Sequence, residues 1–99
     1  MQIKQQLDQY FEAHTKDMLA DIAKLVSFDS VPAPAPETAP FGEGTEKALA
    51  CALEIAKRDG FTVKNFENYV GTVDYFEDRR DAELGMLAHL DVVAVGDGW

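Results

Sequence analysis

Residues 84–93 read Leu84-Gly85-Met86-Leu87-Ala88-His89-Leu90-Asp91-Val92-Val93, an apolar run with only two polar side chains, His89 and Asp91. A run of this kind is typical of an interior β-strand that is covered on both faces, as in an α/β sheet. We therefore expect a strand over residues 84–93. The Gly96-Asp97-Gly98 sequence that follows is a turn signal, so Asp97 is expected to be a turn residue.

Two helices are predicted upstream of this strand. Apolar residues within Ile3–Val26 recur at helical spacing, and residues 43–59 form a second helical pattern, with Gly60 where a C-terminal cap belongs. His14 lies on the first apolar stripe and is interpreted as a packed, hydrogen-bonded residue, with a metal role as the alternative. Cys51, with no second cysteine, is interpreted as a core residue of the second helix rather than a nucleophile. The face of this helix that we expect to be buried consists of Ala48, Leu49, Ala52, Ile55 and Ala56.

Two further strands and a loop complete the expected elements. Residues 61–66 and 70–76 alternate with a period of two, and the short link between them suggests a hairpin. The prolines within residues 27–40 exclude a helix and indicate an ordered surface loop, while residues 77–81 indicate a charged turn. Residues 1–99 are thus expected to form one α/β unit with two helices and about three strands.

The composition of the chain excludes several classes of partner. A net charge of −9 argues against nucleic acid or an anionic membrane, because both require a positive face. The first residues lack the apolar core and cleavage site of a signal peptide, and no stretch approaches the roughly 18 apolar residues of a membrane helix. A single cysteine rules out an internal disulfide, so we expect a cytoplasmic protein.

His89 and Asp91 are the candidate functional residues. Burying these two groups costs several kcal/mol unless they are paired or bound to a metal. Strand side chains alternate, so both residues would point to the same face with their Cα atoms about 6.7 Å apart, and the carboxylate could reach the imidazole. Such a carboxylate fixes the tautomer of the ring and leaves the other ring nitrogen free to bind a metal. A simple buried ion pair without a metal would explain the same residues.

Residues 85–99 resemble the first metal-site motif of the co-catalytic zinc exopeptidases related to aminoacylase and carboxypeptidase G. The resemblance covers the whole chain, and Ser27-Phe28-Asp29-Ser30-Val31 looks like the segment that follows the first helix of this family. One departure is Ala94, followed by Val95, where the family usually has proline. The segments that resemble the bacterial dipeptidase branch, the beta-Ala-Xaa or Xaa-His dipeptidases, are Pro40-Phe41-Gly42-Glu43-Gly44, Asp59-Gly60-Phe61 and Asn68-Tyr69-Val70-Gly71.

The resemblance implies a function and roles for two residues. The chain would be the N-terminal part of a mixed-sheet α/β/α catalytic domain that hydrolyses short unblocked peptides with two zinc ions. His89 would bind one zinc ion, and Asp91 would serve catalysis by orienting this histidine. Because the other ligands and the general-base glutamate of the family are not matched, we expect the chain alone to be inactive and to carry no zinc. The alternatives are a related amide hydrolase, of the aminoacylase or desuccinylase type, and a non-catalytic truncated domain.

The resemblance also implies a neighbour for the strand at residues 84–93. In the family, a strand encoded later in the sequence lies between this strand and the hairpin of residues 61–76. Without that neighbour, the strand would pair with the hairpin in another register or keep an open apolar edge. An open edge is a template for pairing with another chain. We therefore expect the chain to self-associate through residues 84–93.

Overall fold

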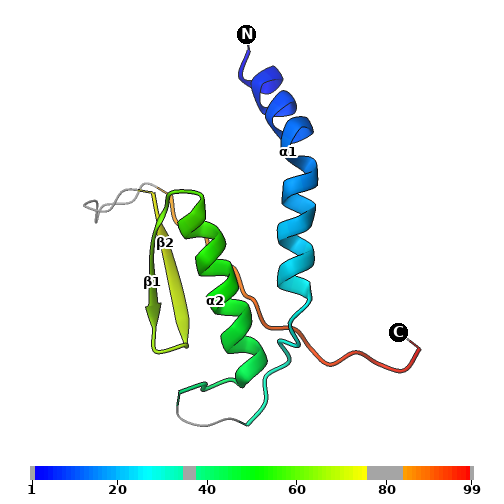
Figure 1. Cartoon of the computed structure of the whole chain (residues 1–99), viewed down its shortest axis with the longest axis vertical. Helices are drawn as coiled ribbons and strands as arrows, with labels where there is room; N and C mark the ends of the chain where they lie inside the picture. Colours follow the sequence, from blue (N-terminus) through cyan, green and yellow to red (C-terminus); the bar gives the residue numbers. More distant parts are fainter. Residues whose placement is uncertain (1, 35–37, 76–83, 99) are drawn as a thin grey trace.

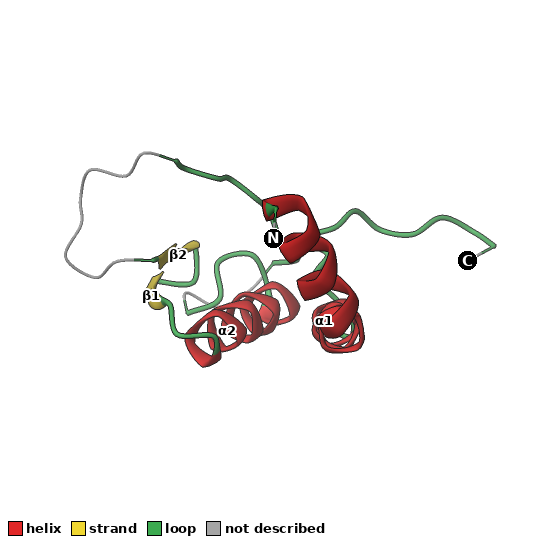
Figure 2. Cartoon of the chain, turned by 90° about the horizontal axis from the view of Figure 1, so that it is seen from above, coloured by secondary structure: helices red, strands yellow, loops and turns green. Residues whose placement is uncertain are grey.

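The computed structural model describes residues 2–34, 38–75 and 84–98 (Figure 1). Figure 2 shows the second helix between the first helix and the hairpin, and this helix contacts both of them. The predicted α/β class is confirmed. None of the helices in these ranges is long and apolar enough to cross a membrane. The elements are α1 (Ile3–Val26), α2 (Glu43–Arg58), β1 (Thr62–Phe66) and β2 (Val70–Asp74), and the two strands form an antiparallel sheet.

The end of α2 is fixed by a Schellman motif. The Phe61 N–H donates to the Ala56 carbonyl over 3.1 Å, and the Gly60 N–H donates to the Lys57 carbonyl over 3.0 Å. Gly60 has a φ of 95°, a left-handed conformation that side chains with a Cβ disfavour. The predicted second helix and its stop at Gly60 are confirmed, since Asp59 is the C-cap residue.

The predicted hairpin is also confirmed. β1 and β2 pair in register along all 5 residues of each strand. Glu67 and Asn68, at the centre of the turn, have φ values of 55° and 63°, as a type I′ turn requires. The Tyr69 N–H closes the turn by donating to the Phe66 carbonyl over 3.0 Å. The last residue predicted for the second strand and the predicted charged turn, residues 76–81, lie outside the described residues.

Most of the small core is supplied by α2. Ala48, Cys51 and Leu53 of α2 are buried, which confirms the core interpretation of Cys51. Gly71 lets β2 approach the side of α2 that carries Leu49 and Leu53, because a Cβ there would lie 2.8 Å from Leu53 Cδ2 and 3.0 Å from Leu49 Cδ1. The other predicted residues of this face are only half-buried, namely Leu49, Ala52, Ile55 and Ala56.

Helix α1 follows its predicted bounds but has no buried residue. Its contact with α2 includes a two-pronged ion pair, in which Arg58 Nη1 and Nη2 donate to the Asp21 carboxylate over 3.0 and 2.9 Å. The hydrogen bonds from Arg58 hold the pKa of the Asp21 carboxyl below its ordinary value of 3.8. His14 Nδ1 lies 2.8 Å from the Tyr10 carbonyl oxygen and its ring stacks on the Tyr10 ring, so the hydrogen-bonded interpretation of His14 is confirmed. The apolar side chains of α1 that are 39–75% exposed include Ile3, Leu7, Phe11, Met18, Ile22 and Val26.

The strand predicted at residues 84–93 is not formed, and this prediction was wrong. The segment has no regular secondary structure, and its large apolar side chains are exposed, Leu90 least of them at 37%. A strand covered on both faces needs neighbouring strands to pair its N–H and C=O groups. Among the described residues, the strands are β1 and β2, and these pair with each other. The predicted turn at Gly96-Asp97-Gly98 is confirmed, with Gly98 at a φ of 91°.

Candidate functional site

The segment that carries His89 and Asp91 is anchored by the loop that follows α1. The Val92 N–H donates to the Ser30 carbonyl over 3.2 Å, and Ser30 is buried. Within this loop the Val31 N–H donates to Asp29 Oδ1 over 3.3 Å, which folds the loop into an Asx-type turn. The anchor therefore joins the segment to the body of the protein one residue after Asp91.

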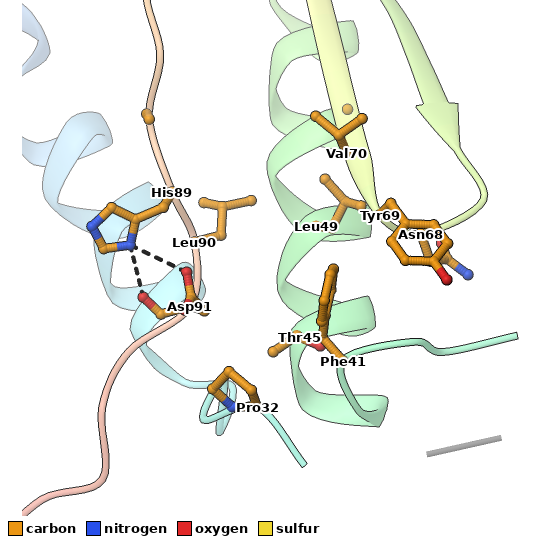
Figure 3. A pocket seen from close by; sticks show the side chains of 12 residues that line it. Pro32, Phe41, Thr45, Leu49, Asn68, Tyr69, Val70, His89, Leu90 and Asp91 are labelled. Atoms are coloured by element: carbon orange, nitrogen blue, oxygen red, sulfur yellow. Dashed lines mark hydrogen bonds and ion pairs between the residues drawn. The ribbon is translucent and has the colours of Figure 1, made fainter. Parts of the chain in front are cut away.

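His89 and Asp91 form a local pair (Figure 3). His89 Nδ1 lies 2.9 Å from the backbone carbonyl oxygen of Asp91 and 3.3 Å from its carboxylate oxygen Oδ1. Because the backbone carbonyl oxygen can only accept a hydrogen bond, Nδ1 carries the proton, and in the neutral ring the Nε2 lone pair is left free. The carboxylate thus reaches the imidazole, as the spacing predicted.

The predicted burial of this pair is wrong. The His89 side chain is 83% exposed and the Asp91 side chain is 54% exposed. The burial was inferred from the apolar residues around the pair, and those residues are exposed as well because the segment has no strand neighbours among the described residues. The desolvation cost that motivated the prediction is therefore small in this chain.

A groove of about 540 Å³ lies between this segment and the side of α2 and β2. In Figure 3, the Leu90 side chain projects from the segment toward Leu49, whereas the His89 imidazole projects from the opposite side. On the far wall, the rings of Phe41 and Tyr69 meet edge to face with their centroids 5.4 Å apart. The groove is therefore mainly apolar, and the imidazole stands at its edge.

Asn68 links the turn of the hairpin by a hydrogen bond to Thr38, in the loop that precedes α2. Its Nδ2 donates to the Thr38 carbonyl over 2.6 Å, and its Oδ1 accepts from Asn65 Nδ2 over 2.8 Å. The Asn68 N–H in turn donates to Asn65 Oδ1 over 2.8 Å. These hydrogen bonds fix the backbone next to Tyr69, which lines the groove.

The described residues do not build a complete zinc site. Across residues 2–34, 38–75 and 84–98, no group of three or more His, Cys, Asp or Glu side chains could hold a metal ion. Protein zinc sites use three or four such ligands. His89 Nε2 is one suitable donor, held in a defined tautomer, while His14 lies on α1 and Cys51 is buried in α2. Within these ranges, the ring nitrogen His89 Nε2 is therefore not joined by enough other candidate donors to form such a site.

Three residues that shape the site were quoted above only within the segments that carry the family resemblance and were given no individual role: Ser30, Gly44 and Asn68. A glycine within a helix is less favourable than alanine by about 1 kcal/mol, so Gly44 carried a signal of close packing. Asn68 carried a second signal, because asparagine tolerates the left-handed conformation that hairpin turns need. Ser30 gave no such signal, since only its backbone carbonyl makes the contact described above.

Comparison with known proteins yields a consistent set of relatives. No protein-family model matches the chain. It is 40% identical over 90 residues to the beta-Ala-Xaa dipeptidase of Lactobacillus delbrueckii subsp. lactis, a match that covers 89% of this chain and 19% of that protein. It is 36% identical over 86 residues to YtjP of Bacillus subtilis (strain 168), provisionally named a dipeptidase, with 85% and 18% covered. A Staphylococcus aureus (strain USA300) protein with a similar provisional name is 38% identical over 98 residues, with 97% and 20% covered. The matched region is therefore about a fifth of the length of these curated relatives.

Proposed function

We propose that this chain, which is homologous to bacterial dipeptidases over nearly all of its length, forms part of a dipeptidase-type hydrolase that cleaves short peptides. The observation that carries the proposal is the identity of 36–40% across 85–97% of the chain. The relatives bear dipeptidase names, which favours a dipeptidase over the related amide hydrolases. We further infer that the protein is zinc-dependent and acts in the cytoplasm.

In this proposal His89 supplies one zinc ligand and Asp91 orients it. The support is geometric: Nδ1 faces two oxygen atoms of Asp91, and Nε2 is exposed on the other side of the ring. A histidine ligand whose second ring nitrogen is held by a carboxylate or carbonyl oxygen is the usual arrangement at protein metal sites. The other ligands would come from sequence that the longer relatives carry and this chain does not match. We assign no step of the reaction to the residues of this chain beyond holding and orienting that ligand.

The proposal can be tested by grafting the chain into a relative. Its residues replace the matched fifth of the Lactobacillus beta-Ala-Xaa dipeptidase, and dipeptide hydrolysis and bound zinc are measured. We expect an active hybrid in which His89→Ala lowers the rate by about 100-fold or more and reduces the zinc content. Asp91→Asn should lower metal affinity or rate by about 10–100-fold, the usual effect of removing a partner of a metal ligand.

The matched control is His14→Ala, because His14 is the other histidine of the chain and makes its hydrogen bond within α1. This variant should keep the zinc content and most of the activity of the hybrid. Full activity and full zinc content in the His89→Ala hybrid would refute the assignment of His89. A folded hybrid without any dipeptide hydrolysis would count against the proposed function itself.

A further inference from the structure

We propose that Gly44 and Ser30 are positioning residues for the His89–Asp91 pair. They would act through the loop of residues 27–31, which lies between the first turn of α2 and the segment that carries the pair. The consequence for activity rests on the proposed function, whereas the positioning itself can be measured without any activity. Gly44 has no side chain and the contact of Ser30 with Val92 is made by its backbone carbonyl, so their effect would be exerted through the backbone.

The first step is the approach of the loop to α2 at Gly44. A Cβ on Gly44 would lie 1.6 Å from the Asp29 carbonyl oxygen and 2.7 Å from the Asp29 carbonyl carbon. Both are backbone atoms, so no rotation of a side chain could relieve the overlap. Any residue other than glycine at this position must therefore displace the backbone of Asp29, and with it the loop.

The second step is the internal hydrogen bonding of this loop. Ser27 Oγ donates to the Lys24 carbonyl over 2.6 Å at the end of α1. The Val31 N–H donates to Asp29 Oδ1 over 3.3 Å and closes a turn around Ser30. Because Ser30 lies inside this turn and is buried, a displacement of Asp29 also displaces the Ser30 carbonyl.

The third step is the link from Ser30 to the pair. The Ser30 carbonyl accepts the Val92 N–H over 3.2 Å, and among the described residues this is the one backbone hydrogen bond from residues 84–98 to the rest of the chain. Val92 follows Asp91 directly, and the Asp91 carbonyl in turn holds His89 Nδ1 at 2.9 Å. A shift at Gly44 therefore reaches the imidazole through a short run of backbone contacts.

The experiment uses the ¹⁵N-labelled 99-residue chain and two measurements by NMR. The ¹⁵N shifts of the His89 ring report which nitrogen carries the proton, and amide exchange at Val92 reports its hydrogen bond. In Gly44→Ala, we expect Val92 exchange to rise by about tenfold and the His89 shifts to move toward those of a free imidazole, since one modest hydrogen bond is lost. The control is Gly85→Ala in the same segment, because a Cβ at Gly85 meets nothing within 4 Å. It should leave both signals unchanged.

A second variant breaks the same link without touching α2. Val92→Pro removes the N–H that Ser30 accepts, so the His89 ring shifts should move as they do in Gly44→Ala. This variant decides the question if Gly44→Ala fails to fold, which loss of the β1–β2 amide signals would reveal. Unchanged His89 shifts in Val92→Pro, or an unprotected Val92 amide in the unmodified chain, would overturn the proposal. If the ring shifts move but the grafted hybrid has no activity, the positioning stands and the proposed function fails.

Discussion

Two regions of this chain differ sharply in how far their apolar side chains are buried. Helix α2 buries Ala48, Cys51 and Leu53, and the α2–hairpin unit has defined ends at Gly60 and at the type I′ turn. Helix α1 and residues 84–98 are just as rich in apolar residues, yet they bury almost none of them. In Figure 1, the segment that begins at residue 84 passes behind α2 and then runs past the lower end of α1 to the C-terminus.

The difference depends on which apolar faces are covered by another element among the described residues. The hairpin and α2 are adjacent in sequence, so each covers the apolar face of the other. The apolar faces of α1 and of residues 84–93 have no such cover among the described residues, although the sequence patterns that predict them are strong. The match covers about a fifth of the length of each of these relatives.

The largest effect is expected in the unit formed by α2 and the β1–β2 hairpin. Leu53 is buried on α2 against Gly71, so Leu53→Ala leaves a cavity that the glycine cannot fill. We expect the free energy of unfolding of the α2–hairpin unit to fall by about 2–5 kcal/mol. Urea titration monitored by amide exchange of β1 and β2 measures this unit without interference from α1.

The control is Leu87→Ala, which removes the same atoms from a side chain that is fully exposed. It should leave the stability of the hairpin unchanged within about 0.5 kcal/mol, as surface substitutions do. An equal loss of unfolding free energy in the two variants would show that the two regions do not differ in packing.

A second effect is expected in residues 84–93, whose apolar side chains are exposed. We propose that the chain self-associates through residues 84–93, because an exposed apolar segment without a strand partner in the described structure can pair with a second copy. Leu87→Asp should weaken this association by about 1.5–3 kcal/mol, the value of burying one leucine side chain. Sedimentation at micromolar concentration measures the change in mass.

The matched variant is Leu7→Asp on α1, which places the same charge on the other exposed apolar surface. If association runs through residues 84–93, this variant should sediment like the unmodified chain. A chain that stays monomeric at all concentrations would contradict the proposal. If Leu7→Asp dissociates the complex and Leu87→Asp does not, the interface lies on α1 instead.

Local patterns predicted local structure well. The stop of α2 at Gly60 and the hairpin turn depend on a few neighbouring residues, and both were correct. The strand at residues 84–93 depends on neighbours that the described chain does not provide, so its periodicity alone gave the wrong structure and the wrong burial of His89. The contact between Gly44 and Asp29 joins two segments through backbone atoms, so a glycine in the helix could indicate close packing but not which segment approaches it.

The smallest effect concerns the pH dependence of the contact between α1 and α2. The Arg58 hydrogen bonds lower the pKa of the Asp21 carboxyl below 3.8 in the folded chain. A carboxyl whose pKa is lowered by folding stabilises the contact above its unfolded pKa of about 4, and this contribution is lost as the pH falls through the folded pKa. Both side chains are partly exposed, so the effect is small and is screened by salt.

Asp21→Asn tests this contribution, and the Arg58 Nε–H signal in NMR reports it. In the unmodified chain the signal should move as the pH falls below about 4, because the Asp21 carboxylate becomes protonated. In Asp21→Asn the part of the shift that is due to Asp21 should be absent. Asp8→Asn is the control, since Asp8 pairs with Lys4 within α1 and does not bridge the helices. If the signal titrates identically in all three chains, Asp21 does not hold α1 against α2.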